Sequence, residues 1–245
     1  MTAASAETVT LWRPTGQKEL DLVAASQWRE WPPRLPEQPI FYPVLNRWYA
    51  TKIAREWNAP HEGVGYVTRF SIRKNYLDRF PVQQAGGRDV LEYWIPAEEL
   101  AGFNASLAGP IVEVARYLGQ VPDHEFTQAA SRLGYQFPAA WREYLQGQSW
   151  LSRGWLESGC HLTLLAPGES ADQVDALQAA PSFPGLMILG GDRSREMLAV
   201  DARNNAANIV LIDITAGSWD HAVPQMPIQQ FIAEIEAGTF EFTWN

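Results

Sequence analysis

The sequence predicts an α+β protein of two domains. Three observations lead to this prediction: strand-like and helix-like segments alternate along the chain, the apolar pattern is interrupted near residue 120, and the charge balance changes at the same point. With 245 residues, of which 46% are hydrophobic, the chain can bury an ordinary core. We therefore expect an N-terminal mixed α/β domain over residues 1–119 and a C-terminal domain over residues 120–245.

The first predicted elements surround an arginine. Residues 9–12 form a predicted strand that leads into Arg13, and residues 17–25 have the spacing of a helix. Residues 29–39 contain four prolines, each of which fixes a backbone angle and removes a donor, so a helix is excluded there. We expect an extended connection whose tryptophans pack against the domain.

A helix and three strands complete the first half. Large apolar side chains recur at helical spacing between residues 45 and 57, and we interpret this stripe as core. They are Leu45, Trp48, Tyr49, Ile53 and Trp57. Alternation over residues 66–72 predicts a half-buried strand. Another strand is expected over residues 90–95, followed by a helix that begins at Pro96, and a last strand over residues 111–117.

Helices and strands also alternate in the second half. Asp123 is expected to cap a helix that stops at Gly134, and Pro138 opens a second helix. Apolar runs between turn residues predict four strands. These runs are residues 162–165, 186–189, 197–201 and 209–213, with turns at 190–192 and 204–205. A final helix over residues 227–237 has one apolar face and stops at Gly238.

The two halves differ in charge. Residues 1–119 hold 13 basic and 13 acidic residues, whereas residues 120–245 hold 6 arginines, no lysine and 15 acidic residues, so the second half carries the whole net charge of −9. Such a field repels nucleic-acid phosphates and anionic lipid and accelerates the approach of a basic protein. A merely solubilising surface is the alternative interpretation.

Several other classes of function lack support. No apolar run approaches the roughly 20 residues needed to cross a bilayer, and the first residues resemble no signal or transit peptide, so we expect a cytoplasmic protein. The single cysteine, Cys160, excludes an internal disulfide and a multi-thiolate zinc site. The four histidines show no metal-binding spacing, and the glycine-rich segments match neither a P-loop nor a dinucleotide-binding fingerprint. We expect no metal.

A series of short motifs in the second half resembles the SUKH (SMI1/KNR4) superfamily over about half of the chain. The motifs are Phe137-Pro138, Trp141, Tyr144-Leu145, Leu189-Gly190-Gly191-Asp192, Met197-Leu198-Ala199-Val200-Asp201, Pro227-Ile228 and Phe231-Ile232. The resemblance implies a non-catalytic domain with an antiparallel sheet and packed helices. Many bacterial members are immunity proteins that bind and neutralise polymorphic toxins, often nucleases, and the fungal members are regulatory scaffolds.

The interpretation we favour is an immunity-type protein that needs no cofactor and binds a basic protein toxin through its acidic domain. Carboxylates suit this role because a nuclease holds phosphates on a basic surface. The candidate acids, expected outside helices and strands, are Glu157, Asp192, Glu196 and Asp220. Trp150 and Trp155, in an expected loop over residues 148–159, are candidate anchors. Solvated charges and tryptophans buried against the sheet are the alternatives.

The first half is distantly similar to the ADP-ribosyltransferase fold. Val9-Thr10-Leu11-Trp12-Arg13 ends in arginine, and Glu92-Tyr93-Trp94-Ile95-Pro96 begins in glutamate, as two motif strands of that fold do. The resemblance implies that Arg13 pairs with an oxygen of NAD, and that Glu92 hydrogen-bonds a ribose hydroxyl and stabilises a cationic transition state. Thr68 or Ser71 would supply a small hydroxyl. An NAD-using enzyme with Arg13 and Glu92 as catalytic residues, and with the second half as its regulatory or targeting module, is thus the alternative function. A buried ion pair or a solvent-facing charge is the simpler account of both residues.

Overall fold

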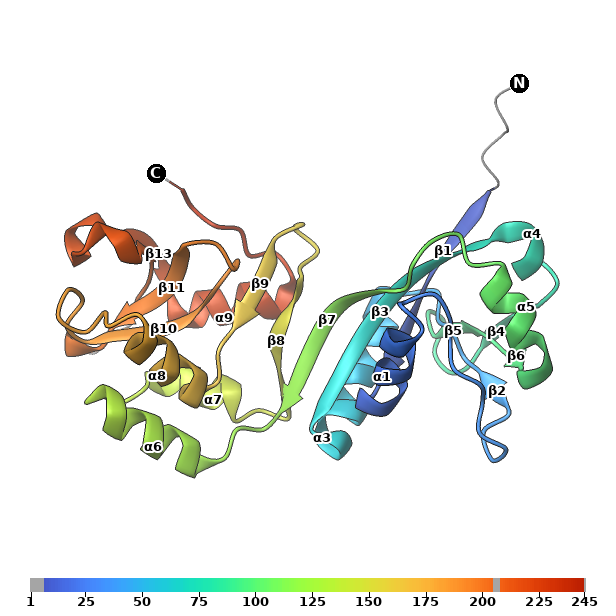
Figure 1. The fold of residues 1–245 in the computed structure, drawn as a ribbon, viewed down its shortest axis with the longest axis horizontal. Helices are drawn as coiled ribbons and strands as arrows, with labels where there is room; N and C mark the ends of the chain where they lie inside the picture. Colours follow the sequence, from blue (N-terminus) through green and yellow to red (C-terminus); the bar gives the residue numbers. More distant parts are fainter. Residues whose placement is uncertain (1–6, 205–207, 245) are drawn as a thin grey trace, which may run out of the picture. The chain divides into compact units, whose positions relative to one another are not determined.

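The computed structural model describes residues 7–204 and 208–244 (Figure 1). The chain divides into two compact units, Met1–Tyr117 and Leu118–Asn245, called unit 1 and unit 2 below. Both units are mixed α/β, and antiparallel strand pairs are present in each. The division lies two residues before the expected boundary at residue 119.

Unit 1 holds a long strand pair with short helices and strands around it. Its elements are β1 (Thr8–Thr15), α1 (Gln17–Ala25), β2 (Ile40–Phe41), α2 (Arg47–Ile53), the π-helical turn η1 (Ala54–Asn58), α3 (Ala59–Glu62), β3 (Val64–Arg73), α4 (Lys74–Leu77), β4 (Val82–Gln84), β5 (Leu91–Tyr93), β6 (Ile95–Pro96), the 3-10 turn η2 (Ala97–Glu99), α5 (Leu100–Ala105) and β7 (Val112–Gly119). The strand, helix and extended connection expected before residue 40 are all present.

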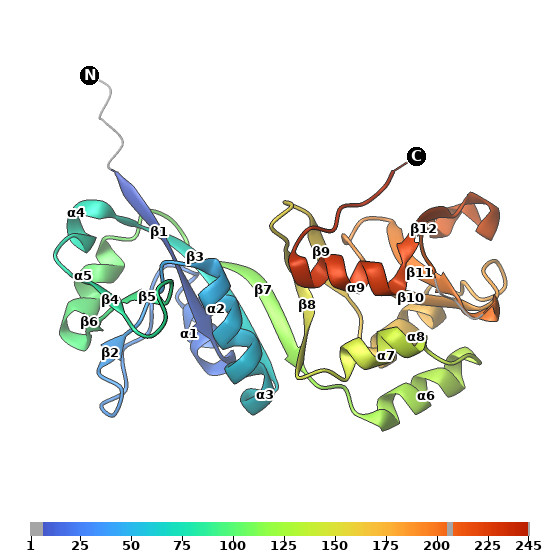
Figure 2. The same ribbon diagram turned by 180° about the vertical axis from the view of Figure 1, so that it is seen from behind.

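The core of unit 1 forms around β1 and β3, which pair antiparallel over their common length, from Thr8 with Arg73 to Thr15 with Tyr66. Figures 1 and 2 show α1 on one side of this pair and α2 on the other. An aromatic cluster fills the core, with neighbouring ring centroids 5.1–5.9 Å apart. Its members are Trp31, Phe41, Phe70 and Phe103. The proline-rich connection thus contributes a core side chain, as expected.

The interpretation of the aromatic stripe as core is wrong for two of its members. Trp48 and Trp57 are 48% and 64% exposed, whereas the helical segment buries Ala50 and Ala54 completely. A Cβ atom on Gly65 would lie 2.1 Å from the Ala54 carbonyl oxygen, so the backbones of the helix and β3 are in contact. Only small side chains fit between them, and the larger aromatic rings lie outside.

The strand expected over residues 90–95 is divided in two. β5 pairs with β4, and β6 pairs with β2, so the two pieces belong to different ladders. Trp94 stands between them and is 48% exposed. Pro96 ends β6 and precedes a 3-10 turn instead of beginning a helix, because its extended backbone pairs with Ile40.

Unit 2 contains a longer antiparallel sheet. Its elements are α6 (Asp123–Leu133), α7 (Ala139–Leu145), β8 (Ser149–Trp155), β9 (His161–Leu164), α8 (Pro167–Ala176), β10 (Leu186–Gly191), β11 (Glu196–Asp201), the 3-10 turns η3 (Ala202–Asn204), η4 (Ile214–Ala216) and η5 (Trp219–His221), β12 (Asn208–Asp213), β13 (Val223–Pro227) and α9 (Ile228–Ala237). The strands β8 to β13 lie in sequence order. The four predicted strands are confirmed as β9 to β12.

Several predictions for unit 2 are corrected. The expected loop over residues 148–159 contains the strand β8, whose residues 149–152 are all buried, as in a strand covered on both faces. Pro122, not Asp123, precedes α6, and the Asp123 carboxylate accepts hydrogen bonds from Arg142 and Gln146. Helix α8 and strand β13 were not predicted.

Other predictions for unit 2 hold with small changes. Gly134 and Gly238 end α6 and α9 with positive φ angles of 77° and 73°. The expected turn residues Gly190 and Gly191 belong to β10, where a Cβ atom on Gly190 would lie 2.1 Å from a carbonyl oxygen of β9. Asn205, part of another expected turn, lies outside the described residues. Among the described residues, no helix is long and apolar enough to cross a membrane.

Two leucines of α1 provide a matched test of the unit 1 core. Leu20 is 6% exposed and Leu22 is 57% exposed. We expect Leu20→Ala to lower the free energy of unfolding by about 2–4 kcal/mol, because it removes buried methyl groups and leaves a cavity. Leu22→Ala is expected to change it by less than about 0.5 kcal/mol. Urea titrations measure both, and equal effects would contradict the placement of α1.

Candidate active site

Two buried arginines of unit 1 share one carboxylate. Arg13, on β1, donates from Nε and Nη2 to Glu19, at N–O distances of 2.9–3.0 Å. Arg34, in the proline-rich connection, donates from Nη1 to the same carboxylate at 3.0 Å. Both arginine side chains are only 10% exposed. We call these three residues the arginine triad.

Local sequence explains how the triad forms. Burial alternates along β1, so Leu11, Arg13 and Thr15 point into the unit. Glu19 lies in the first turn of α1, where the helix dipole favours an acidic side chain. The Arg13 guanidinium also lies 4.7 Å from the centroid of the Phe41 ring, and its Nη1 donates to the Tyr42 carbonyl oxygen at 3.1 Å.

Glu92 is a buried carboxylate of a different kind. It is 8% exposed, and its hydrogen bonds come from neutral donors, Trp94 Nε1 at 2.7 Å and Tyr49 Oη at 3.5 Å. Within residues 7–204 and 208–244, the structure gives Glu92 no ion pair. Burial first, and then the neighbouring Glu92 carboxylate, raise the pKa of Tyr49, so the phenol is a proton donor at neutral pH.

The backbone brings Glu92 next to β1. Val44 forms antiparallel bridges with Trp12 on one side and Glu92 on the other. Two strand spacings of about 4.8 Å therefore separate the backbones of Trp12 and Glu92. Since side chains alternate along a strand, Glu92 shares a face with Trp12, and Arg13 approaches from the opposite face.

Arg13 and Glu92 nevertheless line one cavity of about 580 Å³, a volume in the range of small-molecule sites. Arg34 also lines it, together with Tyr42 and Trp57, which are 39% and 64% exposed. The structure thus brings both predicted catalytic residues to the same site. Sequence reasoning missed Arg34, which occurs in no motif, and assigned Trp57 to the core.

The predicted small hydroxyls have other positions. Thr68 is fully buried, and its Oγ1 donates to the Arg13 carbonyl oxygen at 2.8 Å. It therefore anchors β1 to β3 and does not line the cavity. Ser71 pairs with Thr10 farther along the same two strands.

Most predicted partner-binding residues lie at one end of the unit 2 sheet. Because β8 to β13 are consecutive antiparallel neighbours, the connections β8–β9, β10–β11 and β12–β13 occur at the same end. This end, which we call the hairpin end, comprises residues 155–161, 191–197 and 213–223. It contains Trp155, Glu157, Asp192, Glu196 and Asp220. Two of the acids expected outside regular elements lie within them, Glu196 at the start of β11 and Asp220 in the 3-10 turn η5. Trp150 differs: it is fully buried and donates from Nε1 to the Gly119 carbonyl oxygen at 3.0 Å, so it is a core residue.

The hairpin end is not uniformly acidic. Arg193 and Arg195 lie in the same β10–β11 connection as Asp192, and Arg195 is 3.7 Å from the Asp213 carboxylate. Trp155 is 51% exposed and packs edge-on against His161, with centroids 5.1 Å apart. Aromatic and mixed-charge groups therefore occur together there.

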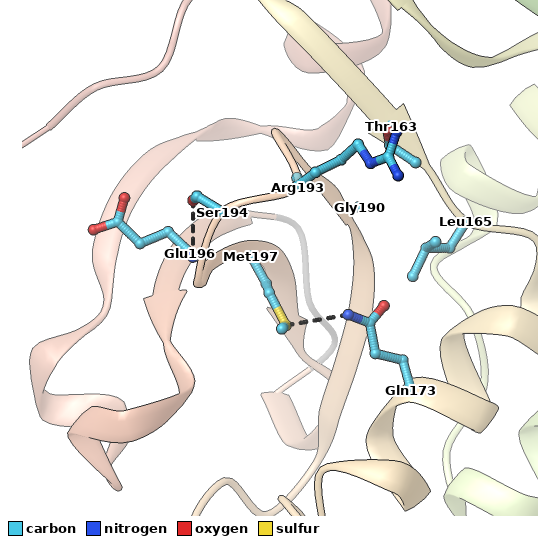
Figure 3. Close-up of a pocket in the computed structure, with 9 residues that line it drawn as sticks. Thr163, Leu165, Gln173, Gly190, Arg193, Ser194, Glu196 and Met197 are labelled. Atoms are coloured by element: carbon cyan, nitrogen blue, oxygen red, sulfur yellow. Dashed lines mark hydrogen bonds between the residues drawn. The ribbon is translucent and has the colours of Figure 1, made fainter.

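A small pocket of about 90 Å³ opens beside the hairpin end (Figure 3). Gln173 of α8 donates to the Met197 sulfur at 3.6 Å, and Arg193 and Glu196 contribute to the lining. Thr163 also lines the pocket, and among the described residues its buried Oγ1 has no hydrogen-bond partner. The space suits one small polar group rather than a nucleotide.

The surroundings of Cys160 disfavour a reactive thiol. Burial, and then the carboxylates of Asp192 and Glu241, raise the pKa of Cys160 to about 11. The thiol is thus protonated at neutral pH, which disfavours a nucleophilic role. Among the described residues, no group of three or more His, Cys, Asp or Glu side chains could hold a metal ion.

Comparison with known protein families gives no match, and no curated protein matches the sequence.

Proposed function

We propose that unit 1 is an enzyme of the ADP-ribosyltransferase type, which binds NAD⁺ and breaks its N-glycosidic bond. One observation carries the proposal. Glu92 is a buried carboxylate without an ion pair among the described residues, and it lines an open cavity that also receives two guanidinium groups. Its hydrogen bonds come from neutral donors, Trp94 and Tyr49, which leaves the carboxylate available to a cationic ligand.

The charges of the cavity complement those of NAD⁺. The dinucleotide carries a cationic pyridinium ring on one ribose and an anionic pyrophosphate next to that ribose. Glu92 offers a negative group for the cationic end, and the arginine triad offers a positive wall for the anionic centre. Exposed Trp57 and Tyr42 add flat surfaces on which an aromatic ring can stack.

The expected chemistry is heterolysis of the bond between ribose C1′ and the pyridinium nitrogen. The electron pair of that bond leaves with the nitrogen, so nicotinamide departs as a neutral molecule and positive charge develops on the ribose. Glu92 stabilises this charge electrostatically. The oxygen of water, or of an acceptor that replaces water, then bonds to C1′ and loses a proton. With water, the products are ADP-ribose, nicotinamide and a proton.

Replacing Glu92 tests the proposal directly. We expect Glu92→Gln to lower the rate of nicotinamide release from NAD⁺ by at least about 100-fold, because the amide keeps the shape of the side chain but removes its charge. Glu98→Gln, at an exposed carboxylate in the 3-10 turn η2, is the control and should keep the rate. Chromatography of nicotinamide and circular dichroism measure activity and folding. Wild-type protein that neither binds nor consumes NAD⁺ would refute the proposal.

A second function is favoured by a different observation, the convergence of five predicted partner-binding residues at the hairpin end. In this proposal unit 2 is a SUKH-like immunity domain that binds a basic protein toxin in the cytoplasm. The exposed Trp155 ring would anchor the complex, and nearby carboxylates would pair with basic groups of the toxin. Arg193 and Arg195 limit how far acidic charge alone can guide the partner.

Two similarly exposed tryptophans test this second function, since Trp155 of unit 2 is 51% exposed and Trp48 of unit 1 is 48% exposed. The partner to use is the purified product of a toxin gene adjacent to the gene of this chain. Trp155→Ala should weaken binding at least about tenfold, whereas Trp48→Ala should not, because Trp48 lies on α2 of unit 1 and aromatic anchors within an interface carry most of its binding energy. Calorimetric titration measures both. Unchanged affinity after Trp155→Ala would show that the hairpin end is not the interface with the toxin.

A further inference from the structure

We infer that Arg34 is the group that binds the anionic part of the ligand, so that the unit 1 cavity selects ligands with a pyrophosphate. The inference takes the identity of the ligand, NAD⁺, from the proposed function. The position of the anion site comes from the geometry of the arginine triad. Arg34 matches no residue of the motif strands that suggested Arg13 and Glu92.

The hydrogen bonds of the triad leave Arg34 poorly satisfied. Glu19 receives three of its four arginine hydrogen bonds from Arg13, whose Nη1 is occupied by the Tyr42 carbonyl oxygen. Arg34 has one short bond, to Glu19, and a long one of 3.4 Å from Nη2 to Gln38 Oε1. Its Nε is buried with no partner. Of the two guanidinium groups, Arg34 is therefore the less fully hydrogen-bonded.

The charges of the triad do not balance. Two guanidinium groups, each nine-tenths buried, share the single negative charge of Glu19. Burial first, and then repulsion by Arg13, lower the pKa of Arg34, which shows how weakly this cation is compensated. Of the other acids that line the cavity, Glu37 is solvent-exposed and Glu92 approaches from the opposite face of β1. An anion beside Arg34 would supply the missing charge.

The backbone around Arg34 favours a preformed site. Prolines at positions 33 and 36 flank the residue and fix local backbone angles, so the loss of conformational freedom on binding is small. A planar guanidinium donates two parallel hydrogen bonds to phosphate oxygens, a geometry that a carboxylate ligand shares. The cavity volume of about 580 Å³, with stacking surfaces at Tyr42 and Trp57, points to a nucleotide pyrophosphate.

Inorganic pyrophosphate tests the site without any turnover. Calorimetric titration of the full chain should show binding by the wild type and at least about tenfold weaker binding by Arg34→Gln. Arg79→Gln is the control, because Arg79 forms an ion pair with Glu99 at 2.9 Å and does not line this cavity. It should bind like the wild type. No binding by the wild type, or equal binding by Arg34→Gln, would overturn the inference.

Two further variants distinguish anion binding by Arg34 from a purely structural role of the arginine triad and from the proposed reaction. Glu19→Gln removes the competing carboxylate, so pyrophosphate affinity should rise; a fall in affinity with an unchanged circular dichroism spectrum would contradict the charge argument. If that variant fails to fold, the comparison of Arg34→Gln with Arg79→Gln decides. Glu92→Gln should keep pyrophosphate binding while it loses turnover. A variant that loses turnover but still binds pyrophosphate would thus report on the proposed reaction. Loss of pyrophosphate binding in Arg34→Gln would report on the anion site.

Discussion

The ion pairs of Glu19 are the interaction on which the architecture of unit 1 depends. The Glu19 carboxylate, itself on α1, binds Arg13 of β1 and Arg34 of the proline-rich connection, and so joins these three segments. The ion pairs are only partly hydrated. Removing one partner of a buried pair costs about 3–5 kcal/mol, because the other charge is left without compensation. The same residue therefore fixes the fold and sets the charge of the cavity wall.

The rest of the site follows from how tightly the helix after β2 packs on the sheet. Contact between the backbones at Ala54 and Gly65 leaves no room for large side chains. Trp57 consequently lies at the cavity, where it is available to a ligand. On the same face of β1, the Val44 bridges place Glu92 beside the strand, and Tyr49 and Trp94 hold its two oxygens. Tight packing on one face thus creates the aromatic and acidic part of the site.

Much of this arrangement could be predicted from the sequence, and the failures have physical reasons. The predicted strand over residues 9–12 and the resemblance of two strand motifs identified Arg13 and Glu92. Arg34 could not be found, because a proline-rich connection has no periodicity that indicates where its side chains point. Trp57 was wrongly assigned to the core, because helical spacing alone cannot show that the side of this helix that faces the sheet has room only for alanine. In unit 2, Trp150 proved to be core because residues 149–155 pair as a strand.

The central claim is that the unit 1 cavity recognises a ligand with a cationic ring at one end and an anionic group at its centre. Titration with NAD⁺ and NADH tests this most directly, since the two molecules share the pyrophosphate and differ in the positive charge of the nicotinamide ring. The account predicts that NAD⁺ binds at least about fivefold more tightly than NADH, and that Glu92→Gln removes the difference. Equal affinity for the two dinucleotides in the wild type, or tighter binding of NADH, would contradict it.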